Sequence, residues 1–439
     1  MLKLLIDNSY SQLGGMTPEQ MATVKNVLSY QVSSSESFYS GAGRFSNRRY
    51  LIDKKGIFPS GLLYLVLACI DKNHWAHEVS DRRVKPTKIL SGMDAPYLNL
   101  KPYPEQTASA DAAVKNHRSC LVAPTGSGKS LIIALIIKRL KVKTLIIVPT
   151  LGLKEQLKES LLTWFGSLDN IHVENIDSVN LKRASDYDLV ICDECHHGAA
   201  KTYRTLNRKN WTKIYYRVFL TATPYRSNED EQLLMESLCG PVVYRIPHKL
   251  AVEKKFIVPI EAYYYDLPKI KCDAYTWAEV YSSLVVKRKD RNQLIADLLD
   301  NLMEAGKSAI CLVKEIAHGD LIRAEMKHPC PFIKGEETGK HTLIQEFNKQ
   351  ENLILIGTEG CLGEGIDTKA CEYVIIAGLG KSRPRLLQQC GRSVRRYPGK
   401  ESAKVIIFRD FSHKFTARHF REQVKTIRDE YGVDVVKIV

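Results

Sequence analysis

The sequence has no long run of apolar residues. Its best candidate, Leu131 to Leu140, is interrupted by Lys138 and Arg139 and falls well short of the roughly 18 apolar residues that a membrane-spanning helix needs. The first residues, MLKLLIDNSYSQ, also lack the apolar core and small-residue cleavage site of a secretory signal. We therefore expect a protein of a cytoplasm with no membrane partner.

Acidic residues are scarce relative to basic ones. Asp and Glu number 49 against 64 Lys and Arg, which gives a formal net charge of +15. The segment 381–437 alone holds 15 basic and 6 acidic residues, so nine of the fifteen net charges lie there. A surplus gathered in one stretch favours a polyanionic partner.

The eleven cysteines lack the spacing of a disulfide or zinc framework. Most of them sit in apolar runs, as Cys69, Cys120 and Cys311 do, and are expected to be reduced core thiols. The segment CDECHH at 192–197 has one pair of ligands at zinc-like spacing, but no second pair follows at the distance found in zinc fingers. We therefore expect no zinc site.

A glycine-rich segment at 123–130 lies between an apolar strand, Cys120 to Val122, and an apolar helix, Leu131 to Leu140. This order predicts a Walker A phosphate loop, in which Ala123 replaces the usual first glycine. Its backbone N–H groups would surround phosphate oxygens, its lysine would add a positive charge, and its serine would ligate Mg²⁺. A coincidental glycine-rich turn is the alternative. The predicted nucleotide-binding residues here are Thr125, Gly126, Ser127, Gly128, Lys129 and Ser130.

Two adjacent acids, Asp193 and Glu194, follow the apolar run Leu189 to Cys192. They therefore belong at the carboxyl end of a strand, where α/β proteins bind ligands. Asp193 can hold the Mg²⁺ that bridges ATP phosphates, and Glu194 can orient and deprotonate the attacking water. The alternative is a solvated strand end that caps the next helix.

Thr221-Ala222-Thr223-Pro224 follows a further apolar strand, Val218 to Leu220. Its hydroxyl side chains could relay movement between the acidic pair and a nucleic-acid surface, and an ordinary turn before proline is the alternative. The predicted coupling residues are His196, Thr221 and Thr223.

These motifs occur together with GTEGCLGEGID at 357–367 and QQCGRSVRR at 388–396. The set and its order resemble the superfamily 2 helicases from about residue 102 to 408. The likeness is greatest to the branch that holds UvsW-type phage recombination helicases, XPB and the motor subunits of restriction enzymes. If the chain is phage-encoded, its expected location is the host cytoplasm.

The resemblance implies further site residues. PYPEQ at 102–106 is similar to the Q motif, so Gln106 would recognise adenine with Tyr103 packed against the base. Thr150 and Thr358 would contact the nucleic-acid backbone. Gly365 and Asp367 would approach the nucleotide from the second motor domain.

Three residues of the last motif match Q-x-x-G-R-x-x-R, namely Gln388, Arg392 and Arg395. The resemblance implies that the two arginines face the γ-phosphate, where a planar and permanently charged guanidinium would stabilise the transferring phosphoryl group. A structural salt bridge is the alternative for either arginine alone.

The pattern of apolar runs predicts an α/β protein with two parallel-sheet units and a small α+β N-terminal domain, and the resemblance implies that the two units are tandem RecA-like domains. At 439 residues the chain is long enough for several cores. The expected divisions are an accessory, substrate-selecting domain at 1–98, helicase domain 1 at 99–246, a linker at 247–261 and helicase domain 2 at 262–439. The other expected strands are Tyr50–Ile52, Leu145–Val148, Ala309–Val313, Leu353–Ile356, Tyr373–Ala377 and Lys404–Phe408, and 33–46 is expected to be a loop.

The sequence thus predicts an ATP-dependent and Mg²⁺-dependent DNA helicase or translocase. The resemblance favours branched or forked DNA as substrate and recombination or replication proteins as possible partners. Three alternatives stay open: the motor of a restriction system, an RNA helicase, and a nucleic-acid-binding scaffold with a relict ATP site.

Overall fold

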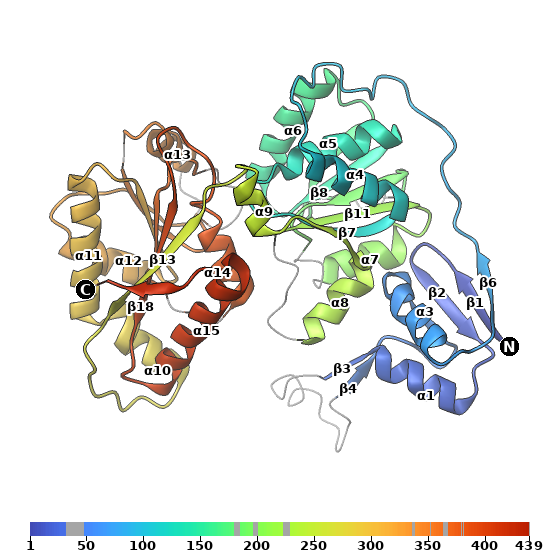
Figure 1. The fold of residues 1–439 in the computed structure, drawn as a ribbon, viewed down its shortest axis with the longest axis horizontal. Coiled ribbons are helices and arrows are strands. Elements are labelled where there is room, and N and C mark those ends of the chain that lie inside the picture. Colours follow the sequence, from blue (N-terminus) through green and yellow to red (C-terminus); the bar gives the residue numbers. More distant parts are fainter. Residues whose placement is uncertain are drawn as a thin grey trace. The chain divides into compact units, whose positions relative to one another are not determined.

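The computed structural model describes residues 1–31, 48–179, 185–195, 201–222, 229–335, 339–351, 353–362, 368–378, 380 and 382–438. Within these ranges the chain forms two compact units, each built on a parallel sheet (Figure 1). The first unit contains Met1–Ala123 and Lys129–Arg245, and the second contains Pro124–Gly128 and Ile246–Val439. Among the described helices, none is both long and apolar enough to cross a membrane.

A small mixed sheet with the strand order β5-β2-β1-β6 begins the first unit. On β1, Leu2, Leu4 and Ile6 point into the core because alternate residues of a strand face the same side. The predicted α+β character of this region is confirmed. The expected strand at Tyr50–Ile52 is wrong in its bounds, since β4 ends at Tyr50, and the expected loop at 33–46 lies outside the described residues. The elements are β1 (Leu2–Ile6), β2 (Tyr10–Gly14), α1 (Pro18–Val27), β3 (Ser29–Gln31), β4 (Arg48–Tyr50), β5 (Ile57–Pro59), η1 (Ser60–Leu62), α3 (Leu63–Lys72) and β6 (His77–Asp81).

The parallel sheet of the first unit has the order β12-β7-β11-β10-β8-β9. Its four central strands are the four that the apolar runs predicted, and they are apolar because helices cover both faces. In Figure 1, α4, α5 and α6 lie on one side of these strands and α7 and α8 on the other. The elements are α4 (Pro104–Asn116), β7 (Arg118–Val122), α5 (Lys129–Leu140), β8 (Thr144–Val148), α6 (Leu151–Phe165), β9 (Ile171–Asn175), β10 (Leu189–Cys192), α7 (Lys201–Lys209), β11 (Tyr216–Thr221), α8 (Glu229–Cys239) and β12 (Val242–Arg245).

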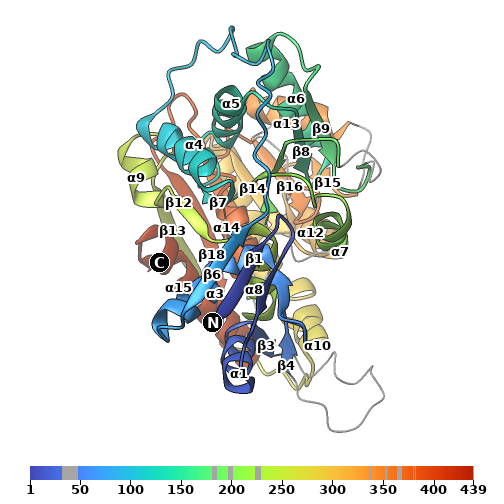
Figure 2. The same cartoon turned by 90° about the vertical axis from the view of Figure 1, so that its right-hand side faces the viewer.

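The N-terminal sheet is fastened to this parallel sheet by buried polar groups. Arg217 of β11 is 1% exposed and donates to Asn207 Oδ1 (2.5 Å), to Ser9 Oγ (3.2 Å) and to main-chain carbonyls. Ser9 Oγ in turn lies 2.6 Å from the carbonyl of Asn207. Gly61 packs so closely on α8 that a Cβ there would lie 2.3 Å from the Ser237 carbonyl oxygen. In both views α3 lies beside α8 (Figures 1 and 2).

The parallel sheet of the second unit has the order β15-β16-β14-β17-β18-β13-β19. Four of these strands match the predicted apolar runs. The segment 247–261, expected to be a linker, contains α9 and the start of β13. In Figures 1 and 2, α12 lies on one side of this sheet and α14 and α15 on the other. The elements are α9 (His248–Glu253), β13 (Ile260–Asp266), α10 (Trp277–Tyr281), the π-helical turn η3 (Ser282–Val286), α11 (Lys289–Glu304), β14 (Ala309–Val313), α12 (Ile316–Glu325), β15 (Phe332–Ile333), α13 (Lys340–Asn348), β16 (Ile354–Thr358), β17 (Tyr373–Ile376), α14 (Arg383–Cys390), β18 (Ala403–Arg409), α15 (Lys414–Tyr431) and β19 (Val435–Lys437).

Candidate nucleotide-binding site

The predicted phosphate loop joins the end of β7 to the start of α5. Gly126 and Gly128 have φ angles of 85° and 80°, in the left-handed region that residues with a Cβ rarely adopt. Between them, Ser127 donates both its N–H (3.1 Å) and its hydroxyl (2.7 Å) to the carbonyl of Pro124. The helix begins at Lys129, two residues earlier than the apolar run indicated, so the loop ends directly at a helix N-terminus. Such a terminus attracts anions.

The two predicted acids lie just beyond β10. Asp193 continues the strand pairing by donating its N–H to the Ile147 carbonyl (2.9 Å), and its side chain accepts the N–H of Glu194 (2.9 Å). Glu194 has a φ of 49°, which is unusual for a residue with a side chain. Strained backbone of this kind concentrates at functional sites.

The structure brings Lys129 and Glu194 together. The lysine Nζ lies 2.9 Å from Glu194 Oε1, and the two side chains are only 12% and 16% exposed. A largely buried ion pair needs excellent geometry to offset the loss of hydration, so this contact fixes both groups beside the loop. A lysine and a carboxylate held together at a helix N-terminus are groups suited to a polyphosphate and its metal ion.

A metal ion would find suitable oxygen ligands in the same place. Ser130 lies in the first turn of α5 and is partly exposed, and Asp193, just beyond β10, is an 8% exposed residue. Mg²⁺ typically binds one or two protein oxygens and completes its shell with phosphate and water. This donor set therefore fits magnesium.

The Q-motif residues have a structural role that sequence reasoning missed. Gln106 is 4% exposed, and its Oε1 accepts the N–H of Tyr103 (3.0 Å) at the start of α4. Tyr103 itself is 42% exposed. The signal that could have revealed the cap is the proline at position 104, which favours the first turn of a helix.

The predicted threonines occupy strand and helix ends. Thr150 caps α6, since its hydroxyl accepts the N–H of Leu153 (3.3 Å). Thr358 ends β16, is 9% exposed and accepts the N–H groups of residues 361 and 362 through its carbonyl. Thr221 is fully buried, and its carbonyl accepts the N–H of Ala123 (3.0 Å), which ties β11 to the start of the phosphate loop. His196, Thr223, Gly365 and Asp367 lie outside the described residues.

The residues of the last motif lie at and after the end of α14. Gln388 is on the helix, and the Arg392 N–H donates to the carbonyl of Gln389 (3.1 Å). The main chain of Arg395 pairs with Ile257, and its carbonyl accepts the Lys400 ammonium (2.8 Å). Both arginine side chains are partly exposed. The backbone at Arg395 is thus held by two contacts, one from Ile257 and one from Lys400.

The cysteine of the acidic motif is part of the core. Cys195 is fully buried, and its thiol is in hydrogen-bond contact with Cys120 and Cys239. Burial raises the pKa of Cys195 well above its usual value, so the thiol stays protonated and unreactive. All eleven cysteines are free, as the apolar surroundings predicted.

Two family models match separate parts of the chain. Residues 98–186 and 165–226 match the family model described as type III restriction enzyme, res subunit, and residues 290–397 match the helicase conserved C-terminal domain. The first match covers the phosphate loop and acidic pair, and the second covers the arginine motif. The chain belongs to superfamily 2 of the helicases.

Several relatives of this helicase act on DNA according to their names. It is 21% identical over 432 residues to the ATP-dependent DNA helicase UvsW of Enterobacteria phage T4, covering 83% of this chain and 81% of that one. It is 33% identical over 162 residues to the DNA 3'-5' translocase XPB2 of Sulfurisphaera tokodaii, covering 34% and 36%. The helicase spans less than half the length of several curated relatives that it matches.

The helicase also shares its fold with solved structures. A type ISP restriction-modification enzyme, LlaBIII, bound to DNA, matches with a TM-score of 0.56 and 16% identity, over 77% of this chain and 31% of that one. At this identity the likeness concerns the fold alone. It agrees with the predicted pair of RecA-like sheets.

Proposed function

We propose that this helicase is an ATP-driven DNA motor that unwinds branched DNA or moves its branch points. The observation that carries the proposal is the buried ion pair between Lys129 and Glu194 at the phosphate loop (2.9 Å). A relict site would have no reason to keep a buried lysine, a catalytic carboxylate and a strained backbone together. DNA is favoured because the relatives named above act on it.

Each site residue receives a role in this proposal. Residues 125–130 hold the phosphates, with Ser130 and Asp193 on Mg²⁺, while Gln106 and Tyr103 bind adenine. Glu194 takes a proton from the attacking water, and Gln388, Arg392 and Arg395, with Gly365 and Asp367, are the further residues assigned to the nucleotide. ATP binding and hydrolysis would drive a cycle of conformational change. Thr150 and Thr358 would hold the DNA backbone in alternation, with His196, Thr221 and Thr223 coupling the two events.

The N-terminal region, residues 1–98, is the proposed selector of branched substrates. Arg49 on β4 and Lys54 in the following turn are exposed cations on a part of the chain that the motor does not use. Asp53 shapes that turn by accepting the N–H groups of Lys55 and Ile57 (2.8 and 2.9 Å). Arg44, which belongs to the same proposed set of cations, lies outside the described residues.

The test compares unwinding of a four-way junction and a linear duplex. Deleting residues 1–98 would strip partners from Arg217, so the double variant Arg49→Ala, Lys54→Ala is the sharper choice. We expect it to lose preference for the junction while keeping DNA-stimulated ATPase activity. Lys72→Ala, an exposed charge at the end of α3, is the control and should keep the preference. An unchanged preference in the double variant would remove the selector role.

The alternatives predict different substrates in the same assay. Stimulation of ATPase by single-stranded RNA but not by DNA would favour an RNA helicase. Translocation on duplex DNA without strand separation would favour a restriction motor, whose fold the helicase shares. Absence of ATP hydrolysis with any nucleic acid would favour the remaining alternative, a nucleic-acid-binding scaffold with a relict ATP site.

A further inference from the structure

A cavity of about 340 Å³ opens in the second unit at the carboxyl ends of its central strands. Lys314 follows β14, Glu359 follows β16 and Gly378 lies just beyond β17, and all three line it. Parallel sheets bind ligands at this edge, and the volume lies in the range of about 300–1,000 Å³ typical of small-molecule sites. None of the residues assigned to the nucleotide site lines this cavity.

One wall of the cavity is aromatic. Trp277 of α10 lies 4.2 Å from the ring of His419 and 6.2 Å from that of Phe415, measured between ring centres. Both partners lie on α15, and Trp277 and Phe415 are only half-buried. Partly open rings of this kind are surfaces on which single-stranded nucleic acids stack their bases.

The mouth of the cavity is basic. Lys314, Arg385 and Arg418 line it and are exposed. The Arg385 guanidinium lies 3.2 Å from the Glu359 carboxylate, whose side chain is 15% exposed. Glu359 partly neutralises Arg385 and also attracts Lys314, so the three cations together leave a net positive charge that a phosphate would neutralise.

A buried amide points to a ligand inside. Gln423 of α15 lines the cavity and is 3% exposed, and its Oε1 has no hydrogen-bond partner among the described residues. Leaving a buried acceptor unsatisfied costs about 1–3 kcal/mol. The exocyclic N–H and ring N–H groups of a nucleobase are donors that this oxygen could accept.

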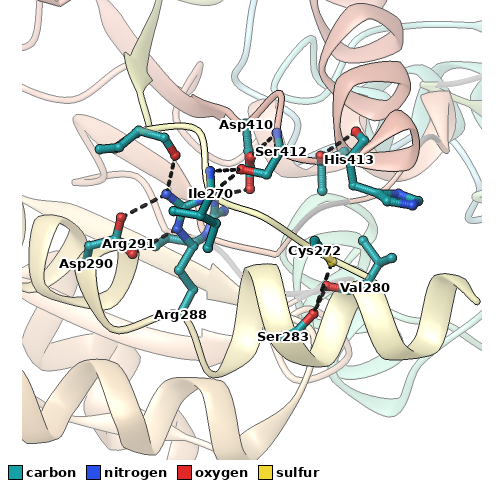
Figure 3. A network of polar contacts seen from close by, with 12 residues as sticks. Ile270, Cys272, Val280, Ser283, Arg288, Asp290, Arg291, Asp410, Ser412 and His413 are labelled. Atoms are coloured by element: carbon teal, nitrogen blue, oxygen red, sulfur yellow. Dashed lines mark hydrogen bonds and ion pairs between the residues drawn. The ribbon is translucent and has the colours of Figure 1, made fainter. Parts of the chain in front are cut away.

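A network of polar contacts around the buried Arg288 holds the walls in place (Figure 3). Arg288, which is 3% exposed, bonds Asp410 (2.9 Å) beyond β18 and Asp290 (2.8 Å) at the start of α11. The N–H of Ile270 donates to Ser412 Oγ (3.0 Å). These bonds join the segments on either side of α10 to the segment that leads into α15, so the facing aromatic rings keep their spacing.

We propose that this cavity binds one unstacked nucleotide of a DNA single strand. The base stacks on Trp277 and bonds Gln423, and the flanking phosphates meet Lys314 and Arg418. The inference rests on the proposed DNA motor function and adds a base-binding subsite to it. Its position suits a strand held by Thr358, because Glu359 directly follows that residue in the chain.

The test measures binding of the full chain to a short oligothymidylate that carries one central 2-aminopurine. We expect Trp277→Ala to weaken binding by about tenfold, as loss of a stacking partner does, and to abolish the quenching of 2-aminopurine.

Gln423→Leu should weaken binding several-fold while leaving the melting temperature unchanged or raised, because it removes a buried acceptor. Arg418→Ala should reduce the salt dependence of binding by about one phosphate contact. Lys425→Ala removes the same charge from an exposed site elsewhere on α15 and serves as control.

A second oligonucleotide separates base binding from backbone binding. Replacing the 2-aminopurine by an abasic site should weaken binding to the wild type but not to Trp277→Ala. If the wild type binds DNA and all three cavity variants bind it equally well, the cavity is not the subsite, although the motor function stands. If the wild type binds no DNA, the proposed function itself fails. Altered ATP affinity in Gln423→Leu with unaltered DNA affinity would also overturn the subsite.

Discussion

At the scale of single residues, the contact between Lys129 and Glu194 matters most, because both groups have lost most of their hydration and lie beside the phosphate loop. Glu194→Gln keeps the side-chain shape but removes the proposed base. We expect ATP to bind still and turnover to fall by at least about a hundredfold. Fluorescent-nucleotide titration and phosphate release measure the two effects.

Glu155→Gln makes the same chemical change at an exposed position of α6 and should leave turnover unchanged. Turnover of Glu194→Gln at the wild-type rate would show that another group accepts the proton.

A second prediction at this scale concerns Arg395, whose main chain is fixed by Ile257 and Lys400. Arg395→Ala should retain ATP binding and lose DNA-stimulated hydrolysis by about a thousandfold, the effect of removing an arginine that stabilises phosphoryl transfer. Arg395→Lys should recover little, because an ammonium cannot reproduce the planar guanidinium. Single-turnover hydrolysis is the measurement. Arg396→Ala, at the exposed next position, is the control, and full activity in Arg395→Ala would make that arginine structural.

At the scale of elements, Thr150 combines a helix cap with a proposed DNA contact. Thr150→Ala should lower the free energy of unfolding by about 1 kcal/mol, because the Leu153 N–H loses its acceptor. Thr150→Asn and Thr150→Asp both keep a cap, and the aspartate also suits the positive end of the helix dipole. Only the aspartate would repel a phosphate. Urea unfolding and DNA affinity, measured on all three variants, distinguish the roles: equal affinity for the Asn and Asp variants would mean that Thr150 is a cap and nothing more.

The elements that the sequence predicted are those whose pattern is set by burial on both faces. Central strands such as β8 and β14 are continuous apolar runs, so their positions followed from composition alone. Edge strands were missed because only one face is buried: β9 reads Ile-His-Val-Glu-Asn, with alternate residues inside. The phosphate loop was predictable because its glycines and lysine are adjacent in the chain.

The features that escaped prediction, the lining of the proposed base-binding cavity and the burial of Arg217, depend on residues that are far apart in the sequence. Trp277 and Gln423 meet at one cavity from opposite ends of the second unit's sequence, and no local pattern joins them. Arg217 reads as a polar residue at the start of an apolar strand, yet it is fully buried because Ser9 and Asn207 offer it acceptors. Such roles follow from tertiary contacts.

At the scale of the whole molecule, three histidines, the buried His248 and His318 and the half-buried His117, should make the fold sensitive to acid. Burial lowers the pKa of His117 and His248 to about 4 and of His318 to about 3, with Arg83 adding to the effect at the first and Arg291 at the last. The unfolded chain protonates near its ordinary pKa of about 6.5, whereas the folded chain stays neutral there. Stability should therefore fall as the pH drops from about 6.5 towards 4, and unfolding near pH 5 should take up about three extra protons from these groups.

Urea unfolding at a series of pH values measures that proton uptake from the slope of stability against pH. Replacing His318 by Gln should reduce the uptake by about one proton. A slope that does not change in His318→Gln would mean that this histidine is already protonated in the folded protein.

The bond between Ser9 and Arg217 also has a consequence for the order in which the protein is made. Its two partners are separated by 208 positions along the chain. At about 5–20 residues per second, a ribosome needs roughly 10–40 s to deliver the second after the first. During that interval the N-terminal sheet exists without the arginine and without α8, so the face that they cover stays open to water and to other nascent chains. Assembly of the first unit is therefore completed only when β11, α8 and β12 have left the ribosome.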